Sequence, residues 1–422
     1  MRNVAIACIM NAFNMIFPPP EPAWIPGTNI QRTMGLLATS TPARRNRVKI
    51  LFYGQSITRQ DWWKTVEANL RRRFPNADLT VENRAIGGFA ADRLKRTALH
   101  DLPDFYPDLV VLHDYGGEPD YEALIDVIRS TTAAEILVQS DHEVWTGPED
   151  QRPRGEIWHD AHVGWLRDLA RRDRLGFVDV RTPWQTYLKD HALPASSLLT
   201  DGVHLNAKGC DLMASLVAPA LVYNSKLPVD RTLVRESPAK ADQEIEGNRI
   251  ELVGGAGLKV LIDGKPPSQH PELVAAERPS EGFAIDVPAL QRVDSPTPPI
   301  PEDWTVTLTE IAPDVSHWRF RVEGSKTGPD GEGASDAPFV SKSGRVAFGP
   351  GDWYVREAFG IVHQRPPEGF QVHWRTVLRG VDVVPASKTP VTLASGLAKG
   401  IHRLKLVGNV KDARIIVYRP SH

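Results

Sequence analysis

The feature that most constrains the fold is an alternation of apolar runs and helical patterns between residues 47 and 221. Runs rich in β-branched and other apolar residues lie at 48–53, 79–83, 109–113, 135–139 and 176–180. Helical patterns separate them, at 62–73, 90–99, 121–129 and 157–172. Strands that alternate with helices form parallel sheets through right-handed crossovers, with helices on both faces. We therefore predict an α/β fold with a doubly wound, flavodoxin-like parallel sheet of five strands in three layers.

The pattern changes after residue 224. Helical periodicity fades, and short alternating runs follow at 249–253, 258–262, 304–309, 318–322, 371–378, 403–407 and 414–418. Asp263-Gly264 directly after one of these runs is typical of a hairpin. We predict an α/β domain over 46–224, a linker over 225–244, and an all-β sandwich or jelly-roll-like accessory domain over 245–422.

Composition limits the kinds of partner. The chain has 422 residues, 41% of them hydrophobic and 24% charged, which is enough for two or three domains with buried cores. It carries 50 basic and 52 acidic residues, a net charge of -2, and the basic residues are dispersed. Because nucleic-acid binding needs a basic face, we predict no nucleic-acid partner. No segment approaches the ~18 apolar residues of a membrane span, so we predict no membrane partner. The oligomeric state stays open.

The N-terminal residues 1–45 are predicted to be a surface tail. Within them, residues 1–17 have the order of a signal peptide, but Asn11 and Asn14 interrupt the apolar stretch. Two interpretations stay open: a secretory signal, which predicts a secreted or periplasmic protein, and a misassigned start, which is compatible with the cytoplasm. The two cysteines, Cys8 and Cys210, make neither a disulfide framework nor a thiolate metal site. We predict no metal and no cofactor.

Ser56 is the candidate nucleophile. The apolar run 48–53 ends in Gly54-Gln55-Ser56, which is typical of a buried strand that turns abruptly into a helix. This position puts Ser56 at the carboxyl end of a strand, where open α/β sheets bind ligands. A serine needs a base and a third group that orients the base, and Asp201 and His204 supply both. The alternative is structural: Ser56 caps a helix, and Asp201 and His204 belong to a turn.

These residues resemble motifs of the SGNH hydrolases, the GDSL-like esterases and lipases, over roughly residues 45–224. The segment 54–58 is similar to the family's Gly-Asp-Ser motif, with Gln55 in place of the aspartate, and Asp201-x-x-His204 matches its last motif. The resemblance implies a catalytic triad of Ser56, His204 and Asp201, with His204 as the base.

A second motif bears on the oxyanion hole. The segment 83–88, Asn-Arg-Ala-Ile-Gly-Gly, is similar to the family motif whose glycine donates a backbone N–H to the oxyanion. Counting from Asn83 favours Gly88, so the resemblance implies an oxyanion hole made by the N–H groups of Ser56 and Gly88. The alternative for Gly88 is that it serves only its backbone conformation.

A third motif is altered. After the run 109–113 the family has an asparagine that donates to the oxyanion, whereas this chain has Gly117 at that position. Losing such a donor costs about 100-fold to 1,000-fold in turnover. His113 can donate in its place, and Asp114 or Glu118 only when protonated. The candidate substrate contacts are Gln55, His113, Asp114, Glu118, His142 and Trp145.

Aromatic residues indicate the substrate class. The chain has eleven tryptophans, and Trp145 follows the strand predicted over 135–139, where its flat ring can stack on a sugar. No long apolar lid of the kind expected in a lipase is visible. We expect a serine esterase that removes O-acetyl groups from carbohydrate.

Two other functions stay open. The first is cleavage of glycosidic bonds on the same fold, with acid and base taken from Asp114, Glu118, Asp141 and His142. The second is a non-catalytic carbohydrate-binding protein, in which the β domain binds sugar and the first domain has lost its activity. Ester turnover with intact polysaccharide chains distinguishes the esterase from both.

Overall fold

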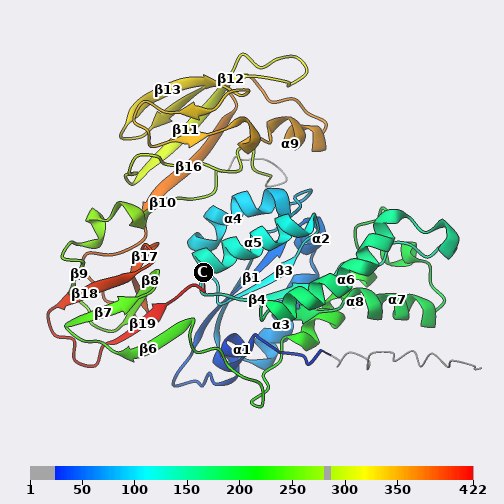
Figure 1. The fold of residues 1–422 in the computed structure, drawn as a ribbon, viewed down its shortest axis with the longest axis horizontal. Coiled ribbons are helices and arrows are strands. Elements are labelled where there is room, and N and C mark those ends of the chain that lie inside the picture. The colour runs from blue at the N-terminus through cyan, green and yellow to red at the C-terminus, as the bar shows by residue number, and fades with distance from the viewer. Residues whose placement is uncertain (1–23, 280–286, 422) are drawn as a thin grey trace, which may run out of the picture.

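The structure is a computed structural model in which residues 24–279 and 287–421 are described. It consists of an α/β part followed along the chain by a β-rich part (Figure 1). The signal-like segment at residues 1–17, including Cys8, lies outside the described residues. In the two described ranges, no helix is both long and apolar enough to span a bilayer.

A five-stranded parallel sheet lies at the centre of the α/β part. Its order is β2-β1-β3-β4-β5, which confirms the predicted doubly wound sheet. Alternate residues of β1 point to opposite faces: Ile50 and Phe52 pack in one core, and Leu51 and Tyr53 in the other. Burial on both faces explains why the strands read as continuous apolar runs. The strands are β1 (Arg47–Gly54), β2 (Asp78–Asn83), β3 (Leu109–His113), β4 (Glu135–Gln139) and β5 (Gly176–Val178).

Helices cover both faces of this sheet. The face that we call the α8 side packs against α1 (Gln31–Ala38), α3 (Trp62–Arg73), α7 (Arg181–Asp190) and α8 (Ala207–Val217). The opposite face, the α6 side, packs against α4 (Ala91–Phe105), α5 (Glu118–Thr131) and α6 (Arg154–Arg172). The short helix α2 (Ser56–Arg59) directly follows β1. The result is the expected three-layer arrangement.

Helix α1 lies in the segment that we predicted to be a tail. Ile30, Met34 and Leu37 are at most 1% exposed and recur at the spacing of one helix face. The backbone N–H groups of Arg32 and Thr33 donate to the Glu135 carboxylate at 2.9 and 2.8 Å, which attaches α1 to the start of β4. Residues 31–38 are therefore part of the α/β core, and the expectation of a tail up to residue 45 was wrong there.

The antiparallel sheets after the α/β part confirm the predicted C-terminal β domain, but it contains two separate cores where we predicted one sandwich over 245–422. In the first, which we call the sandwich unit, the sheet β17-β8-β19-β6 and the sheet β7-β18-β9 share one apolar core. In the second, the insert unit, the sheet β10-β16-β11-β12-β13 has its own core, to which helix α9 contributes. The insert unit lies in the chain between β9 and β17. The expected linker over 225–244 also differs, because it contains β6 and the start of β7.

These elements have the following bounds. The sandwich unit contains β6 (Val234–Pro238), β7 (Asp242–Glu246), β8 (Arg249–Val253), β9 (Lys259–Ile262), β17 (Val391–Ser395), β18 (Ile401–Val407) and β19 (Arg414–Tyr418). The insert unit contains β10 (Val274–Ala276), β11 (Glu302–Thr309), β12 (Arg319–Gly324), β13 (Gly328–Ala334), β14 (Phe339–Val340), β15 (Ala347–Phe348), α9 (Val355–Ile361) and β16 (Gln371–Leu378). Short 3₁₀ turns occur at Glu149–Gln151, Ala195–Leu198, Ala218–Ala220, Pro267–Gln269, Pro271–Leu273 and Pro350–Asp352.

The insert unit packs on helix α4 (Figure 1). Arg96 on α4 forms an ion pair with Asp352, with Nη1 and Oδ1 2.7 Å apart. The ring of Tyr354 packs edge-on against Phe89, with ring centroids 4.9 Å apart, and the Arg93 guanidinium lies 4.5 Å from the centre of the Tyr354 ring. These contacts hold α9 beside the carboxyl edge of the parallel sheet, where the candidate site lies.

Candidate active site

The turn after β1 determines where Ser56 lies. Gly54 has φ +153°, and a Cβ there would lie only 1.8 Å from the carbonyl oxygen of His113, so this close approach of two strands requires glycine. Gln55 is the N-cap of α2, and its side-chain oxygen accepts the Ile57 N–H at 2.8 Å. Ser56 is the first residue of α2 and therefore stands at the carboxyl end of β1.

Ser56, His204 and Asp201 form a continuous hydrogen-bonded chain. His204 Nε2 lies 2.9 Å from Ser56 Oγ, and His204 Nδ1 lies 2.8 Å from Asp201 Oδ2. Because the carboxylate only accepts, Nδ1 carries the proton and Nε2 is left to accept the proton of the serine. The His204 N–H, the His204 ring and the Val203 N–H all donate to Asp201, and together they lower its pKa to about 2. Asp201 is therefore ionised at neutral pH.

Backbone and side-chain contacts hold the His204 segment in place. The Thr200 N–H donates to the His204 carbonyl at 2.7 Å. Gln60 makes two hydrogen bonds to the backbone of Leu205, each at 2.8 Å, and so ties the His204 segment to the residue that follows α2. Asn206 then caps α8 by accepting the Gly209 N–H at 3.0 Å. His204 and Ser56 are thus connected both directly and through Gln60 and Leu205.

Gly88 lies beside the nucleophile. A Cβ added at the neighbouring Gly87 would lie 3.8 Å from Ser56 Cβ, so this loop passes close to Ser56. Gly88 has φ +77°, a conformation that glycine adopts readily and other residues rarely do. Ser56 and Gly88 both line the same cavity.

Ser56, Asp201 and His204 open into a cavity of about 720 Å³ that is lined by the α/β part and by the insert unit. Most of its wall comes from loops at the carboxyl ends of the parallel strands. Val287 and Ile361, which is the last residue of α9, complete the wall from the insert unit. The lining residues are Gln55, Ser56, Ile57, Arg59, Gly87, Gly88, Tyr115, Asp141, His142, Val144, Glu156, His159, Asp201, Val203, His204, Val287 and Ile361.

Two of the six predicted substrate contacts line the cavity, and four do not. Gln55 and His142 line the cavity. Both have other roles: Gln55 caps α2, and His142 Nε2 donates to the Val203 carbonyl at 2.9 Å. Burial lowers the pKa of His142 to about 4, so its ring is neutral at neutral pH.

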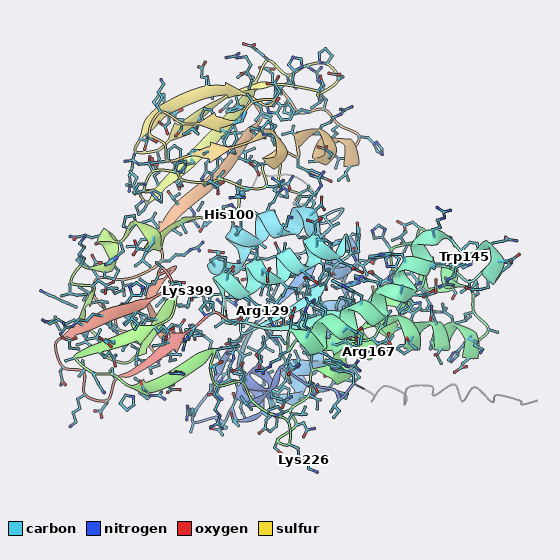
Figure 2. The ribbon with its side chains drawn as sticks, in the orientation of Figure 1. His100, Arg129, Trp145, Arg167, Lys226 and Lys399 are labelled. Carbon is cyan, nitrogen blue, oxygen red and sulfur yellow. The ribbon has the colours of Figure 1, made fainter. Side chains whose placement is uncertain are left out.

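The other four predicted contacts are absent from the cavity wall. His113, the last residue of β3, and Asp114 are fully buried, at 0% exposure. Glu118 starts α5 and points to solvent. Trp145 lines a different hollow of about 880 Å³, toward the outer end of α6 and α7 (Figure 2). Their proposed contact with a substrate at Ser56 therefore does not fit this geometry.

The sequence did not predict that Asp141 and His159 of the cavity wall form a cluster with the buried His113. Asp141 lies between two imidazoles: its Oδ1 is 2.8 Å from His113 Nε2, and its Oδ2 is 3.1 Å from His159 Nδ1. Burial alone would raise the pKa of Asp141, but the contacts with His113 and His159 lower it far below the ordinary value. Asp141 is thus a fixed anion. The clue in the sequence is weak, because His159 is a single histidine on a helix with no motif around it.

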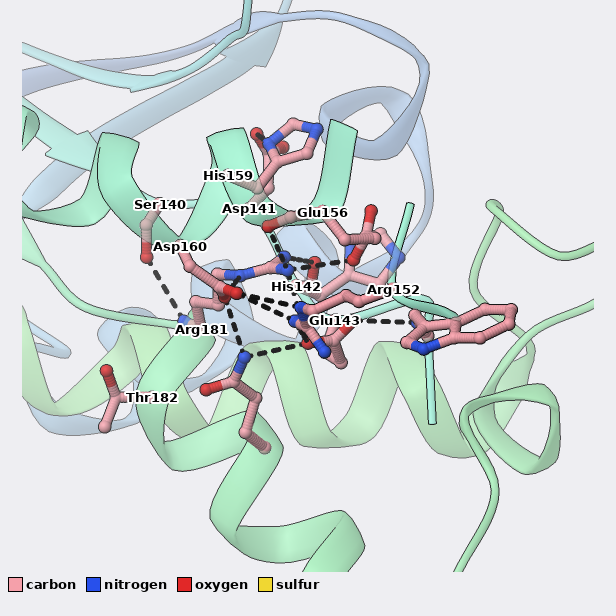
Figure 3. Close-up of polar contacts among 12 residues, drawn as sticks. Ser140, Asp141, His142, Glu143, Arg152, Glu156, His159, Asp160, Arg181 and Thr182 are labelled. Atoms are coloured by element: carbon pink, nitrogen blue, oxygen red, sulfur yellow. Dashed lines mark hydrogen bonds and ion pairs between the residues drawn. The ribbon is translucent and has the colours of Figure 1, made fainter. Parts of the chain in front are cut away.

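A buried ionic network supports the loop that carries Asp141 (Figure 3). Arg181 is 1% exposed and contacts Glu156 at 2.8 Å, Glu143 at 3.2 Å and the carbonyl of His142 at 2.7 Å. Arg152 also pairs with Glu143. Removing one partner of this network would leave an unpaired buried charge, which is strongly destabilising. In the described part of the chain, no group of three or more His, Cys, Asp or Glu side chains is arranged to hold a metal.

The chain was compared with protein families, with curated proteins and with solved structures. Residues 52–212 match the model of the GDSL-like Lipase/Acylhydrolase family. No curated protein matched the chain. Solved structures with some likeness include an acetylxylan esterase from Geobacillus stearothermophilus, at 19% identity and TM-score 0.38 over 42% of this chain and 95% of that one. Another is an alpha/beta hydrolase enzyme from the metagenome of Lake Arreo, Spain, at 19% identity and TM-score 0.36 over 41% and 94%.

Likenesses as distant as these two have no bearing on the substrate of this chain. The family match covers β1, the loop with Gly88, and the segment with Asp201 and His204. Residues 52–212 therefore form a hydrolase domain of the GDSL-like lipase/acylhydrolase family.

Proposed function

We propose that this protein is a serine esterase that removes O-acetyl groups from carbohydrate. The observation that carries the proposal is the chain of contacts from Ser56 through His204 to Asp201 at the mouth of a cavity. A serine hydroxyl becomes a strong nucleophile when a neutral imidazole accepts its proton and an anion fixes that imidazole. Each of these parts is present within hydrogen-bond distance.

In the proposed reaction, Ser56 Oγ attacks the acetyl carbonyl while its proton passes to His204. The N–H groups of Ser56 and Gly88 stabilise the negative charge that develops on the carbonyl oxygen. His204 then gives its proton to the departing sugar oxygen, which leaves an acetyl-enzyme. Water, deprotonated by His204, hydrolyses this intermediate and releases acetate. Asp201 stabilises the imidazolium at both steps.

The cavity wall supports a polar substrate with a small acyl group. Hydrogen-bonding side chains of Tyr115, Asp141, Glu156 and His159 alternate with aliphatic ones around Ser56. Such a mixture suits a sugar, which has hydroxyl groups at its edge and C–H groups on its faces. The wall also has a large apolar part, which suits the C–H faces of a sugar and the methyl group of an acetyl ester.

Glycosidic cleavage, the second function considered from the sequence, is not favoured. Asp114 and Glu118 do not line the cavity, and Asp141 is held as an anion by two histidines, so it cannot act as the general acid. Glycoside hydrolysis ordinarily needs a pair of carboxyl groups across the bond, one of them protonated.

The proposal is tested with a small aryl acetate and an organophosphonate label. We expect the native protein to hydrolyse the ester and to take up one label on the peptide that contains Ser56. Ser56→Ala should lose both, whereas Ser215→Ala, an exposed serine on α8, should lose neither. Ester turnover that survives in Ser56→Ala would overturn the proposal.

A further inference from the structure

Two histidine–aspartate pairs face the same cavity. His204 with Asp201 is the pair described above, and Nδ1 of His159 lies 3.1 Å from Oδ2 of Asp141 on another part of the wall. The pairs differ in burial. The side chain of Asp201 is 57% exposed, whereas that of Asp141 is 11% exposed and has a second imidazole on its other oxygen. Different surroundings of this kind can give two chemically similar pairs different pKa values.

The Asp141 carboxylate forms an ion pair with the His159 ring, and the two side chains lie close together in Figure 3. His159 lies in the second turn of α6, and Asp141 follows β4. Asp141 is itself fixed by His113, whose other ring nitrogen lies 3.2 Å from Thr58 Oγ1. Since Nδ1 of His159 faces Asp141, Nε2 is the nitrogen left for the cavity. Among the described residues, none makes a hydrogen bond to that nitrogen.

His159 and the loop of Gly88 belong to elements that pack on the α6 side of the sheet. Ile86 and Phe89, which flank the loop of Gly88, pack in the same core as Val163 of α6. Leu205, next to His204, packs in the core on the α8 side. The base therefore reaches Ser56 from one side of the sheet, and Gly88 and His159 lie on the other. An ester whose leaving oxygen faces His204 directs its carbonyl oxygen toward Gly88 and His159.

The surroundings of His159 favour its charged form. Burial disfavours the charge, but the contact with Asp141 outweighs burial, and the pKa of His159 is raised above its ordinary value. Glu156 also favours the charge, whereas Arg181 opposes it. His162, which lies one helical turn further along α6, has a pKa lowered to about 4 by burial and is neutral, so it adds no competing charge at neutral pH.

We propose that His159 is a catalytic residue, which donates a hydrogen bond from Nε2 to the substrate carbonyl oxygen as Ser56 attacks, and that Asp141 is its positioning residue. This inference rests on the proposed acyl transfer at Ser56. The imidazolium keeps its proton throughout: the oxygen gains negative charge as the C–O bond to Ser56 forms, and returns to a carbonyl when the leaving oxygen departs. A cation at this point acts together with the N–H groups of Ser56 and Gly88.

The proposal makes a specific prediction for the pH dependence. Activity should fall on the alkaline side as His159 loses its proton, because the neutral ring no longer brings a positive charge to the substrate carbonyl oxygen. An esterase that relied on backbone donors alone would keep its activity on the alkaline side.

The test uses the full chain with a small aryl acetate. His159→Ala should lower kcat by about 100-fold to 1,000-fold with little change in KM. His159→Gln keeps an N–H donor without a titrating ring, so it should retain more activity and lose the alkaline fall. Asp141→Asn should move the alkaline fall to lower pH. His191→Ala, an exposed histidine at the end of α7, is the matched control and should change neither kcat nor the profile.

The outcomes separate this inference from the proposed function. If Ser56→Ala is inactive but His159→Ala stays within about threefold of the native kcat, the role of His159 is wrong and the esterase assignment stands. An alkaline fall that persists unchanged in His159→Gln would also overturn the inference. If Ser56→Ala keeps native activity, the proposed function itself fails. Unfolding midpoints of the variants show whether a loss of activity reflects a loss of structure.

Discussion

Gln55 Oε1 lies 3.1 Å from Ser56 Oγ, so the Ser56 hydroxyl contacts both the N-cap of its own helix and, at 2.9 Å, His204 Nε2. The same oxygen of Gln55 accepts the Ile57 N–H. The residue before the nucleophile thus fixes the first turn of α2 and restrains the serine hydroxyl.

Gln55→Ala should destabilise the protein by about 1 kcal/mol, because α2 loses its cap. Equilibrium unfolding in urea measures this change. Gln151→Ala, at an exposed position, is the control and should be neutral. An unchanged unfolding free energy in Gln55→Ala would show that the cap contributes nothing to stability.

Asp201→Asn should lower kcat by roughly 100-fold to 10,000-fold and leave KM nearly unchanged, because the amide no longer stabilises the imidazolium. Steady-state kinetics on an aryl acetate checks this. Asp211→Asn, an exposed aspartate on α8, should have native kinetics. If both variants behave alike, the Asp201 carboxylate does not act through His204.

Ile361 contributes an apolar wall to the cavity from the insert unit, and its side chain is 49% exposed. We expect Ile361→Ala to raise KM several-fold for acetylated oligosaccharides, which reach that wall, and to leave turnover of a small aryl acetate unchanged. Ile401→Ala, on β18 and 69% exposed, is the matched control. Equal effects on large and small substrates would contradict a role for α9 in substrate binding.

His100 links α4 to the insert unit. Its ring accepts the Val293 N–H at 3.3 Å and contacts the Ala276 carbonyl at 3.2 Å, and burial lowers its pKa to about 4. Between about pH 6.5, the ordinary value, and pH 4, the unfolded chain therefore binds a proton that the folded chain does not. Stability should fall as the pH decreases through this window and level off below it.

The His100 contribution is isolated by comparing urea unfolding of the native protein and His100→Gln at pH 7 and pH 4. The native protein should lose more stability than the variant, by an amount on the order of a few kcal/mol at most. His142 and His162 have similarly lowered pKa values and contribute to the decrease in both proteins. An identical decrease in both would exclude His100 as a source.

Local sequence patterns predict the α/β part well because its strands are buried on both faces and its helices are amphipathic. They predict the β-rich part poorly. Its pairings join distant segments, such as β6 with β19 and β8 with β17, and no local signal specifies which strands meet. For the same reason, the separation into a sandwich unit and an insert unit was not foreseen.

The candidate site divides in the same way. The turn around Ser56 and the Asp201–His204 turn are local features with recognisable spacing, so they can be predicted from the sequence. Ile361 reaches the cavity from a different unit, and His159 becomes significant only through its contact with Asp141. Conversely, Trp145 follows the correct strand but its loop continues away from the cavity, which position in the sequence does not reveal.

The most direct measurement is acetate release from acetylated xylan and pectin fragments, with product masses recorded for the native chain and Ser56→Ala. We expect the native chain to remove acetyl groups from one or both substrates, Ser56→Ala to remove none, and the sugar chains to keep their length. Shortened chains that retain their acetyl groups, or equal acetate release by Ser56→Ala, would contradict it.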